Sequence, residues 1–443
     1  MKNMNKYKIA LGIAVLLLLI SLIMVFTGNV SKSGPFVISF FIILSFAVKG
    51  SPVFKGLSFT MWMFTAVAAA MYYPQFFVSY GEFKLTVLIV PLLQIIMFGM
   101  GAQMSFGDFS EVIRQPKGVL VGAIGHYTIM PLTALLIVRV FHFPDEVAVG
   151  IILIGCVPNG LASNVMSLLC NANLALAVTV SAVTTIVAPF VTPFLMKIIG
   201  GQLIEINIWS MMLDIINMMI FPIIAGFIFN LINGGSAARR AKVIQLTSYF
   251  LLIVLANLIS LIVHPEAGYA GYMTVTVKAL GLFFILPVIV AMLFRYFFKG
   301  DPILVKKILS LTSMVGIAVI VVVITAAGHE SLLAVGGLLL LVVLIHNLSG
   351  YFMGYNLGKL FRLPERSCRT LAFEVGMSNG GLASGLALTM GNIATIGLAP
   401  AIYGPLMNVT GSTLASWWRT KPTKEELEKM KSDAENKPTE EKK

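Results

Sequence analysis

The sequence predicts an all-α polytopic membrane protein, and three observations lead to this fold class. Of the 443 residues, 58% are hydrophobic and only 11% are Asp, Glu, Lys or Arg, about half the charged share of a soluble domain. Fourteen apolar runs follow one another along the chain, most of them close to the roughly 20 residues that cross a bilayer as a helix. Gly-rich polar residues interrupt two of these runs. Lipid is therefore the expected solvent, and helices are expected because backbone groups in lipid must pair within one segment.

The first element is an N-terminal helix that we expect to be retained. Lys2, Lys6 and Lys8 precede the apolar run 9–26, a polarity that is typical of a signal peptide. The run is longer than the apolar region of a signal peptide, and no A-x-A-like cleavage site follows it. We therefore interpret this segment as the first membrane span.

The remaining apolar runs complete the set of spans and indicate their direction. The predicted spans cover residues 9–26, 36–48, 57–73, 85–101, 119–138, 147–169, 174–196, 208–230, 246–262, 277–297, 308–327, 332–357, 371–390 and 393–418. Most basic residues of the connections between spans lie in alternate connections, at Lys49, Lys55, Arg114, Lys117, Arg239, Arg240, Lys242, Lys299, Lys306, Lys307, Lys359, Arg362, Arg366 and Arg369. Because basic connections tend to stay in the cytoplasm, we expect a multi-pass protein of the cell membrane with both termini cytoplasmic.

The charges and cysteines exclude several other classes of protein. The formal net charge is +12, but the basic residues are scattered and do not form the patch of a nucleic-acid-binding protein. Cys156, Cys170 and Cys368 lie far apart without a CxxC pair, so we expect packing residues and neither disulfides nor a zinc site. Residues 419–443 are charged and almost without apolar side chains, which predicts a disordered cytoplasmic tail.

An internal repeat marks the two interrupted runs. Gly160–Ser163 and Gly381–Ser384 both read GLAS, and each is followed by an apolar stretch and then by an asparagine, Asn173 or Asn392. Corresponding breaks in two halves of a chain indicate the binding site of a transporter near the centre of the membrane. The alternative is a pair of close helix contacts between small residues.

Polar residues beside the two breaks favour a cation site. Glu374 is the one charged residue between Thr370 and Trp418, and an ionisable residue inside an apolar span is a candidate functional residue. A neutral, hydrogen-bonded glutamate is the alternative. Ser163 and Asn164 lie at the other break, and Ser181 lies on the next predicted helix. Carboxylate, hydroxyl and amide oxygens are the ligands that hard cations such as sodium prefer.

A second candidate is His126, which lies in an apolar span shortly before Pro131. A single histidine in a membrane span can simply be hydrogen-bonded between helices. The functional alternatives are a cation ligand in the neutral state or a proton acceptor. Asp214 and Lys278 also lie within or near apolar runs, where they can reach the membrane surface, and we expect no role for them.

Eight stretches of the sequence, in order, carry a family resemblance. They are MFGMGAQMSFGDF, RQPKGVLVG, MPLTALL, GIILIGCVPNGLASNVMSLL, TPFLMKIIGG, IHNLSGY, TLAFEVGMSNGGLASGLAL and NVTGSTLASWW. In this combination the chain resembles the bile acid:sodium symporter family. The resemblance implies a ten-helix inverted-repeat core, with a panel domain, a core domain and two broken, crossing helices. It also implies import of an organic anion, bile-acid-like or a small carboxylate, coupled to sodium by alternating access.

The resemblance divides the chain into five parts. It covers residues 57–230 and 308–418, which hold ten of the fourteen predicted spans. Residues 1–56 and 231–307 are additions, each of them a helical hairpin, so the direction of the core is preserved. Residues 419–443 form the predicted tail. The expected architecture is a transporter core with about four additional transmembrane helices.

The resemblance also implies ligands for two sodium ions and for the substrate. The first sodium site would use Ser163, Asn164, Ser181 and Glu374. The second would use Glu374, Val375 and Met377 through carboxylate and carbonyl oxygens, with Ser378 and His126 at the two positions where the family has amide side chains. Asn379 would lie beside the substrate cavity. Sodium is thus the expected coupling ion, the lipid bilayer and an organic anion are the other partners, and no cofactor is expected.

The sequence departs from the family pattern at three positions of the two sodium sites. His126 and Ser378 stand where the family has glutamine, and Ala177 stands where the first site has a hydroxyl group. Our hypothesis is that the first sodium site survives, while the second is weakened or replaced by protonation linked to His126. A proton-coupled organic anion carrier that uses His126 is therefore the first alternative.

Two other functions compete with transport. An enzyme within the membrane would need a catalytic motif, but the sequence has no HExxH and no paired intramembrane aspartates, and we expect no enzymatic activity. A sensor or channel built on the same fold is the other alternative. Accumulation of a solute against its gradient distinguishes a transporter from both.

Overall fold

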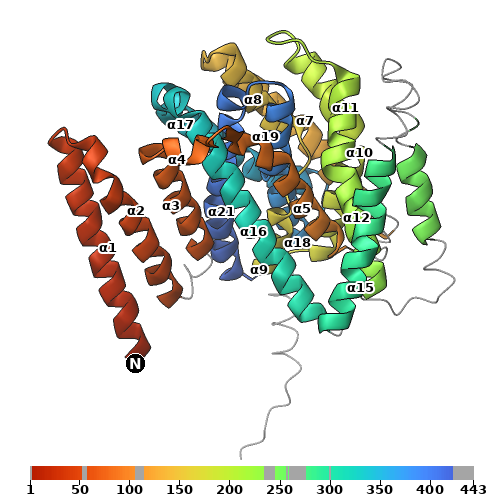
Figure 1. The fold of residues 1–443 in the computed structure, drawn as a ribbon, viewed down its shortest axis with the longest axis horizontal. Helices are drawn as coiled ribbons and strands as arrows, with labels where there is room; N and C mark the ends of the chain where they lie inside the picture. The colour runs from red at the N-terminus through yellow and green to blue at the C-terminus, as the bar shows by residue number, and fades with distance from the viewer. Residues whose placement is uncertain are drawn as a thin grey trace, which may run out of the picture.

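The structure, a computed structural model, describes residues 2–51, 57–104, 114–233, 245–255, 258, 276–298 and 301–422. This part of the chain is helical almost throughout (Figure 1). Nine of its helices are long and apolar enough to cross a membrane. Four shorter apolar helices accompany them, at 58–72, 85–101, 245–255 and 380–389. The all-α polytopic fold predicted from composition is therefore confirmed.

The elements follow the predicted spans closely. In chain order they are α1 (Lys2–Phe26), α2 (Val30–Ala47), α3 (Ser58–Tyr72), α4 (Gln75–Val78), β1 (Ser79–Tyr80), β2 (Phe83–Lys84), α5 (Ile89–Gly101), α7 (Pro116–Val140), α8 (Asp145–Cys156), α9 (Ala162–Leu169), α10 (Leu174–Ile199), α11 (Ile208–Ile215), α12 (Phe221–Asn233), α15 (Leu286–Phe298), α16 (Pro302–Ala327), α17 (His329–Leu360), α18 (Glu365–Gly376), α19 (Gly380–Thr389), α20 (Ile393–Ile396) and α21 (Leu398–Arg419). Short 3-10 turns lie at Val48–Gly50 and Leu85–Leu88, and π-helical turns at Ile216–Ile220 and Gly281–Ile285. Part of the predicted span 246–262 and the tail beyond residue 422 lie outside the described residues.

Two of the predicted spans are broken helices. The span at 147–169 consists of α8 and α9, and the span at 371–390 consists of α18 and α19. Both α8 and α18 have 12 residues, and each begins directly after a proline and with an acidic residue in its first turn, features that favour a helix start. Each helix ends where the next residue, Val157 or Met377, adopts an extended conformation. The breaks thus fall at the Gly-rich interruptions of the sequence.

The N-terminal hairpin lies at one edge of the molecule. Helix α1 packs on α2, and α2 packs on α3 (Figure 1). Gly34 of α2 faces the ring of Tyr72 at the end of α3, where a Cβ atom would lie 2.8 Å from the ring. The Ser33 hydroxyl is hydrogen-bonded to the Tyr72 hydroxyl at 2.8 Å. Most of the large apolar side chains of α1 are exposed, as expected for a helix that faces lipid.

The second additional hairpin packs on α12. Ile253, Ala279 and Phe283 join a buried apolar cluster with residues of α12 such as Phe221 and Ile228. Phe221 and Phe283 lie with their ring centroids 5.4 Å apart. The two hairpins therefore contact different helices, and the apolar core that contains both broken helices is a separate cluster. The three cysteines are free and buried in this structure, in agreement with packing roles.

A row of glycines holds α17 against α18. Gly350, Gly354 and Gly358 follow one another at intervals of four residues, a spacing that lets two membrane helices approach closely. A Cβ atom on Gly350 would lie 2.5 Å from the Cα atom of Gly376 and 2.7 Å from the sulfur of Met130. One on Gly354 would lie 2.5 Å from the carbonyl oxygen of Leu371. Backbone contact between the two helices therefore requires glycine at these positions.

This packing predicts that Gly350→Ala destabilises the protein. The added methyl group must push α17 away from α18, at a cost of about 1–3 kcal/mol for an overpacked contact. The matched control is Gly337→Ala on the same helix, where an added Cβ meets nothing within 4 Å. Thermal unfolding of the two purified variants in detergent tests the prediction. Equal midpoints for both variants would contradict it.

Candidate functional site

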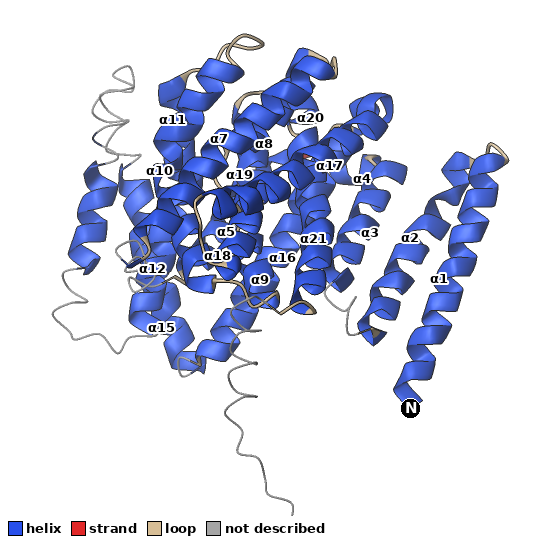
Figure 2. Ribbon diagram, turned by 180° about the vertical axis from the view of Figure 1, so that it is seen from behind, coloured by secondary structure: helices blue, strands red, loops and turns tan. Residues whose placement is uncertain are grey.

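The two breaks lie against each other and pair through their backbones. The Gly160 amide donates to the Met377 carbonyl oxygen at 2.8 Å, and the Asn379 amide donates to the Pro158 carbonyl oxygen at 2.8 Å. Asn159 and Ser378 form one antiparallel bridge between these two bonds. Figure 2 shows the four half-helices in the middle of the helical bundle. Each break thus supplies the hydrogen bonds that the other lacks, as buried backbone groups require.

The place where the two breaks pair is called the crossing below. Glu374 is fully buried beside it, in the last turn of α18. Its Oε2 atom accepts hydrogen bonds from the Asn159 side-chain amide and from the Ser181 hydroxyl, the latter at 2.9 Å. Its Oε1 atom has no hydrogen-bond partner among the described residues. A buried polar atom without a partner is costly, so one oxygen of this carboxyl group keeps unused hydrogen-bonding capacity within the described part of the chain.

The other residues predicted for the first site surround the same carboxyl group. The Ser181 hydroxyl also lies 3.4 Å from the Asn164 Oδ1 atom, and the Ser163 hydroxyl donates to the Gly160 carbonyl oxygen at 2.8 Å and interacts with the carboxyl group. The structure therefore brings Ser163, Asn164, Ser181 and Glu374 together. They come from α9, α10 and α18, which are distant in the sequence.

Asn159 joins this network, although the sequence analysis did not single it out. Its amide nitrogen donates to Glu374, and its Oδ1 atom accepts from the Thr184 hydroxyl at 2.8 Å. The sequence contained a signal, because both breaks carry an Asn-Gly pair. Asn159 follows the end of α8 by three residues, as Asn379 follows the end of α18. When the ends of α8 and α18 are aligned, Asn159 corresponds to Asn379. This alignment differs by one residue from the one that matches the two GLAS sequences.

Two carbonyl oxygens of the predicted second site are engaged with other protein groups. The Val375 carbonyl oxygen lies 3.1 Å from the His126 Nδ1 atom. The Met377 carbonyl oxygen accepts from the Gly160 amide. The Ser378 hydroxyl is buried and has no hydrogen-bond partner among the described residues. The residues of the predicted second site therefore lie close together in space, but the Val375 and Met377 carbonyl oxygens already contact His126 and Gly160.

His126 connects the ends of α8 and α18 from the side of α7. Its ring is fully buried. The Nδ1 atom lies 3.0 Å from the Glu374 carbonyl oxygen, and the Nε2 atom lies 2.8 Å from the Val157 carbonyl oxygen. Glu374 lies in the last turn of α18 and Val157 directly follows α8, so no further helical turn can pair with these carbonyl groups. The histidine is thus hydrogen-bonded between helices and holds the two broken helices together.

Two further side chains complete the end of α18. The Gly376 carbonyl oxygen accepts from the Asn347 amide of α17 at 2.7 Å and from the Tyr403 hydroxyl of α21 at 2.6 Å. The Thr410 hydroxyl in turn donates to the Asn347 Oδ1 atom at 2.6 Å. The crossing is therefore fixed by α7, α17 and α21 together.

Asn379 begins α19 and is nearly buried. Its Oδ1 atom accepts from the Leu382 amide at 3.0 Å, which is the usual contact of a residue that caps a helix. Within the described part of the chain no acceptor pairs with its side-chain nitrogen. The NH₂ group of Asn379 is thus a hydrogen-bond donor beside the positive end of α19.

The site contains oxygen ligands and no cluster of the kind that transition metals use. Among the described residues, no group of three His, Cys, Asp or Glu side chains could hold a metal ion. The carboxylate, hydroxyl, amide and carbonyl oxygens at the crossing are ligands that suit a hard cation.

Comparison with known proteins identifies the family. A family model described as the Sodium Bile acid symporter family matches residues 90–270. The uncharacterized sodium-dependent transporter YocS of Bacillus subtilis (strain 168) is 30% identical over 374 residues, which are 84% of this chain and 94% of YocS. The chain belongs to the sodium bile acid symporter family. The family resemblance inferred from the motifs is thus confirmed.

Other relatives are also described as transporters. The probable sodium/metabolite cotransporter BASS1, chloroplastic, of Oryza sativa subsp. japonica is 26% identical over 372 residues, which are 83% of this chain and 73% of that protein. Among solved structures, the sodium proton antiporter MjNhaP1 from Methanocaldococcus jannaschii aligns with 94% of this chain and 98% of that chain, at 15% identity and a TM-score of 0.40. The latter likeness is weak. Members of this family are sodium-dependent transporters, and the names of the relatives describe no enzyme.

The contacts of His126 predict that His126→Ala weakens the crossing. The change leaves three buried carbonyl groups near the ring without this contact, and one unpaired buried group costs about 1–3 kcal/mol. The matched control is Thr133→Ala on the same helix, because among the described residues the Thr133 hydroxyl bonds only to the Ile129 carbonyl oxygen of α7 itself. Thermal unfolding in sodium-free potassium buffer compares the two. A His126→Ala variant as stable as the control would show that the ring does not hold the two helices.

Proposed function

We propose that this protein imports an organic anion together with sodium, and that sodium binds at Glu374. The observation that carries the proposal is the fully buried carboxyl group of Glu374 with its Oε1 atom unpartnered among the described residues. A buried carboxylate without a compensating charge is unstable. A bound sodium ion would neutralise this charge and use the unpaired oxygen. The names of the relatives, which describe sodium-dependent transport, support the choice of ion.

The other ligands of this ion are expected from the residues around the carboxyl group. Side-chain oxygen atoms around this carboxyl group come from Ser163, Asn164 and Ser181, whereas the Ala177 side chain offers none. Asn159 is a positioning residue in this proposal. Its amide and the Ser181 hydroxyl both bond to Oε2, which leaves the other oxygen directed to the ion.

The proposal includes a second cation position with weaker affinity. It lies at Glu374, Val375, Met377, Ser378 and His126. The physical reason is competition, because the carbonyl oxygens of Val375 and Met377 already contact His126 and Gly160. A cation at this position would have to share those oxygens with the existing contacts. At the first position the Glu374 Oε1 atom has no such contact among the described residues.

The substrate is proposed to bind at Asn379 and the start of α19. The side-chain nitrogen of Asn379 and the first amide groups of α19 are hydrogen-bond donors at the positive end of a helix, which suits the carboxylate of an organic anion. A bile-acid-like molecule and a small carboxylate both carry this group. Sodium at Glu374 would add positive charge nearby and so couple the two ligands.

Transport by this site requires access from both sides of the membrane in turn. We propose alternating access around the paired breaks, in a cell membrane with both termini cytoplasmic. Residues 57–230 and 308–418 would form the ten-helix core, residues 1–56 and 231–307 the two added hairpins, and residues 419–443 the tail. A sensor or channel on the same fold is disfavoured by the transporter names of the relatives.

The proposal predicts a sodium-specific increase in thermal stability that depends on Glu374. An ion that binds the folded state alone stabilises it, so sodium should raise the unfolding midpoint above that in potassium or choline at equal ionic strength. Glu374→Gln keeps the size of the side chain and removes its charge, and should abolish the effect. The control is Glu330→Gln, which removes an exposed carboxylate at the start of α17. Sodium stabilisation that persists in Glu374→Gln would refute the site.

Asn379 provides a separate test of the substrate position. Aspartate can cap α19 as asparagine does, but it lacks the NH₂ group and adds a negative charge. Asn379→Asp should therefore retain the midpoint and the sodium effect, and lose any further stabilisation by carboxylates. Asn379→Ala should instead lower the midpoint itself, because loss of a cap costs about 1 kcal/mol. A panel of carboxylates added in sodium buffer supplies the ligand, and undiminished stabilisation of Asn379→Asp would exclude this position.

A further inference from the structure

A basic cavity lies where three helices begin, away from the crossing of the broken helices. Its volume is about 680 Å³. Its lining consists of Arg114, Gln115, Pro116, Lys117, Gly118, Ala172, Asn173, Leu174, Leu363, Pro364, Arg366 and Ser367. These residues belong to the starts of α7, α10 and α18. No acidic side chain of the described residues lines the cavity.

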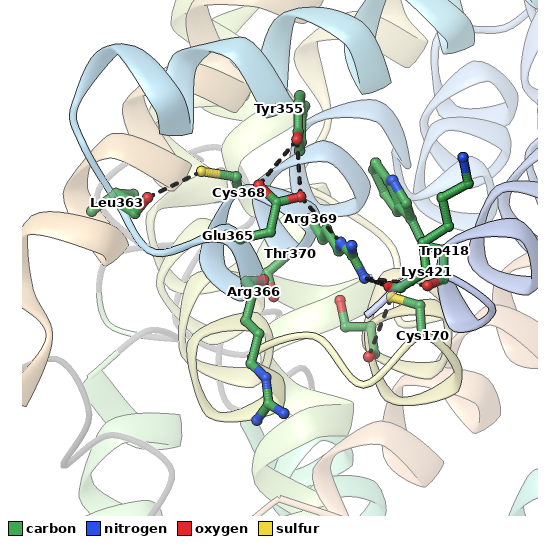
Figure 3. Close-up of polar contacts among 11 residues, drawn as sticks. Cys170, Tyr355, Leu363, Glu365, Arg366, Cys368, Arg369, Thr370, Trp418 and Lys421 are labelled. Carbon is green, nitrogen blue, oxygen red and sulfur yellow. Dashed lines mark hydrogen bonds and ion pairs between the residues drawn. The ribbon is translucent and has the colours of Figure 1, made fainter. Parts of the chain in front are cut away.

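The charged side chains at this end of α18 point in two directions. Glu365 accepts hydrogen bonds from the Tyr355 hydroxyl and forms an ion pair with Arg369 at 3.2 Å. Figure 3 shows these groups turned toward α17 and the end of α21, whereas Arg366 extends away from them. The acidic residue of this turn is thus neutralised elsewhere. Arg366 instead lines the cavity together with Arg114 and Lys117.

One asparagine fixes the shape of the cavity by joining all three helices. The Asn173 side-chain nitrogen donates to the Gln115 Oε1 atom at 2.9 Å and to the buried Ser367 hydroxyl at 3.1 Å. Its Oδ1 atom accepts from the Leu176 amide and so caps α10. The Thr370 hydroxyl donates to its carbonyl oxygen at 3.1 Å. The starts of α7, α10 and α18 are therefore held in fixed positions before any ligand arrives.

We infer that this cavity binds a phosphate group. Three helix starts, with the positive ends of their dipoles, meet at one hollow, and three basic side chains add full positive charges. An arginine carries five N–H donors, so contacts made elsewhere still leave donors for an anion. Charge-assisted bonds to several oxygens on one group suit a phosphate, and the volume is that of a small-molecule site. The group could belong to a soluble phosphate compound or to the headgroup of an anionic lipid.

This cavity is distinct from the proposed sodium site but lies on the same helix. Arg366 and Glu374 are eight residues apart on α18, which corresponds to about 12 Å along a helix. An anion at the start of α18 would therefore act on the orientation of a helix that carries the sodium ligand. The inference does not depend on sodium binding, and potassium buffers keep the two apart in experiments.

The test compares two charge-matched double variants of the full chain. Lys117→Gln with Arg366→Gln removes two basic residues of the cavity. Lys359→Gln with Arg362→Gln removes two basic residues that lie near the same end of the bundle but do not line the cavity. Unfolding midpoints are measured with inorganic phosphate titrated against chloride at equal ionic strength, and in nanodiscs of phosphatidylcholine with or without phosphatidylglycerol.

The result expected is that phosphate or phosphatidylglycerol stabilises the wild type and the Lys359/Arg362 variant, with an apparent affinity at least tenfold lower in the Lys117/Arg366 variant. A response to phosphate alone identifies a soluble ligand, and a response to the anionic lipid alone identifies a headgroup. Equal responses of both double variants, or no response of the wild type to either probe, would overturn the inference. Sodium stabilisation measured on the same Lys117/Arg366 variant should persist, which separates this outcome from failure of the Glu374 site.

Discussion

The backbone pairing of the two breaks is the interaction on which the rest of the structure depends. The Gly160–Met377 and Asn379–Pro158 hydrogen bonds satisfy groups that an interrupted helix leaves unpaired. Neither helix could be interrupted alone inside a bilayer, because unpaired backbone groups in lipid cost several kcal/mol each. The pairing also places the last turn of α18 beside α9 and α10, and so brings Glu374 to the hydroxyl and amide groups that surround it.

Much of this architecture could be predicted because its signals are local. Apolar runs of membrane length, interrupted by Gly, Pro and Asn, predict both the helices and the places where they break. Glu374 could be identified because a carboxylate within an apolar span is costly and usually has a functional role. Ser163, Asn164 and Ser181 were candidates because they are polar residues at the other break and on the next helix, and the family resemblance implies the same ligands. The structure brings all four residues together.

The parts that were not predicted depend on contacts between distant segments. Asn347 and Tyr403 look like ordinary polar residues of apolar helices, and only the packing of α17 and α21 brings them to the Gly376 carbonyl oxygen. Asn159 was not singled out, because Glu374, to which its side chain bonds, lies 215 positions away in the chain. For His126 the sequence left open three roles, and the geometry shows it in contact with carbonyl groups at the ends of two helices. Pattern in one segment cannot specify such partners.

The glycine contacts between α17 and α18 have a consequence for motion. Where Gly350 meets Gly376, backbone touches backbone, and no flexible side chain lies between them to absorb a displacement. Sliding of α18 along α17 would drive other residues of α17 into the same narrow gap. Helices α17 and α18 should therefore move together as one rigid unit. In the proposed alternating-access cycle, sliding surfaces are then to be sought where this unit meets the remaining helices.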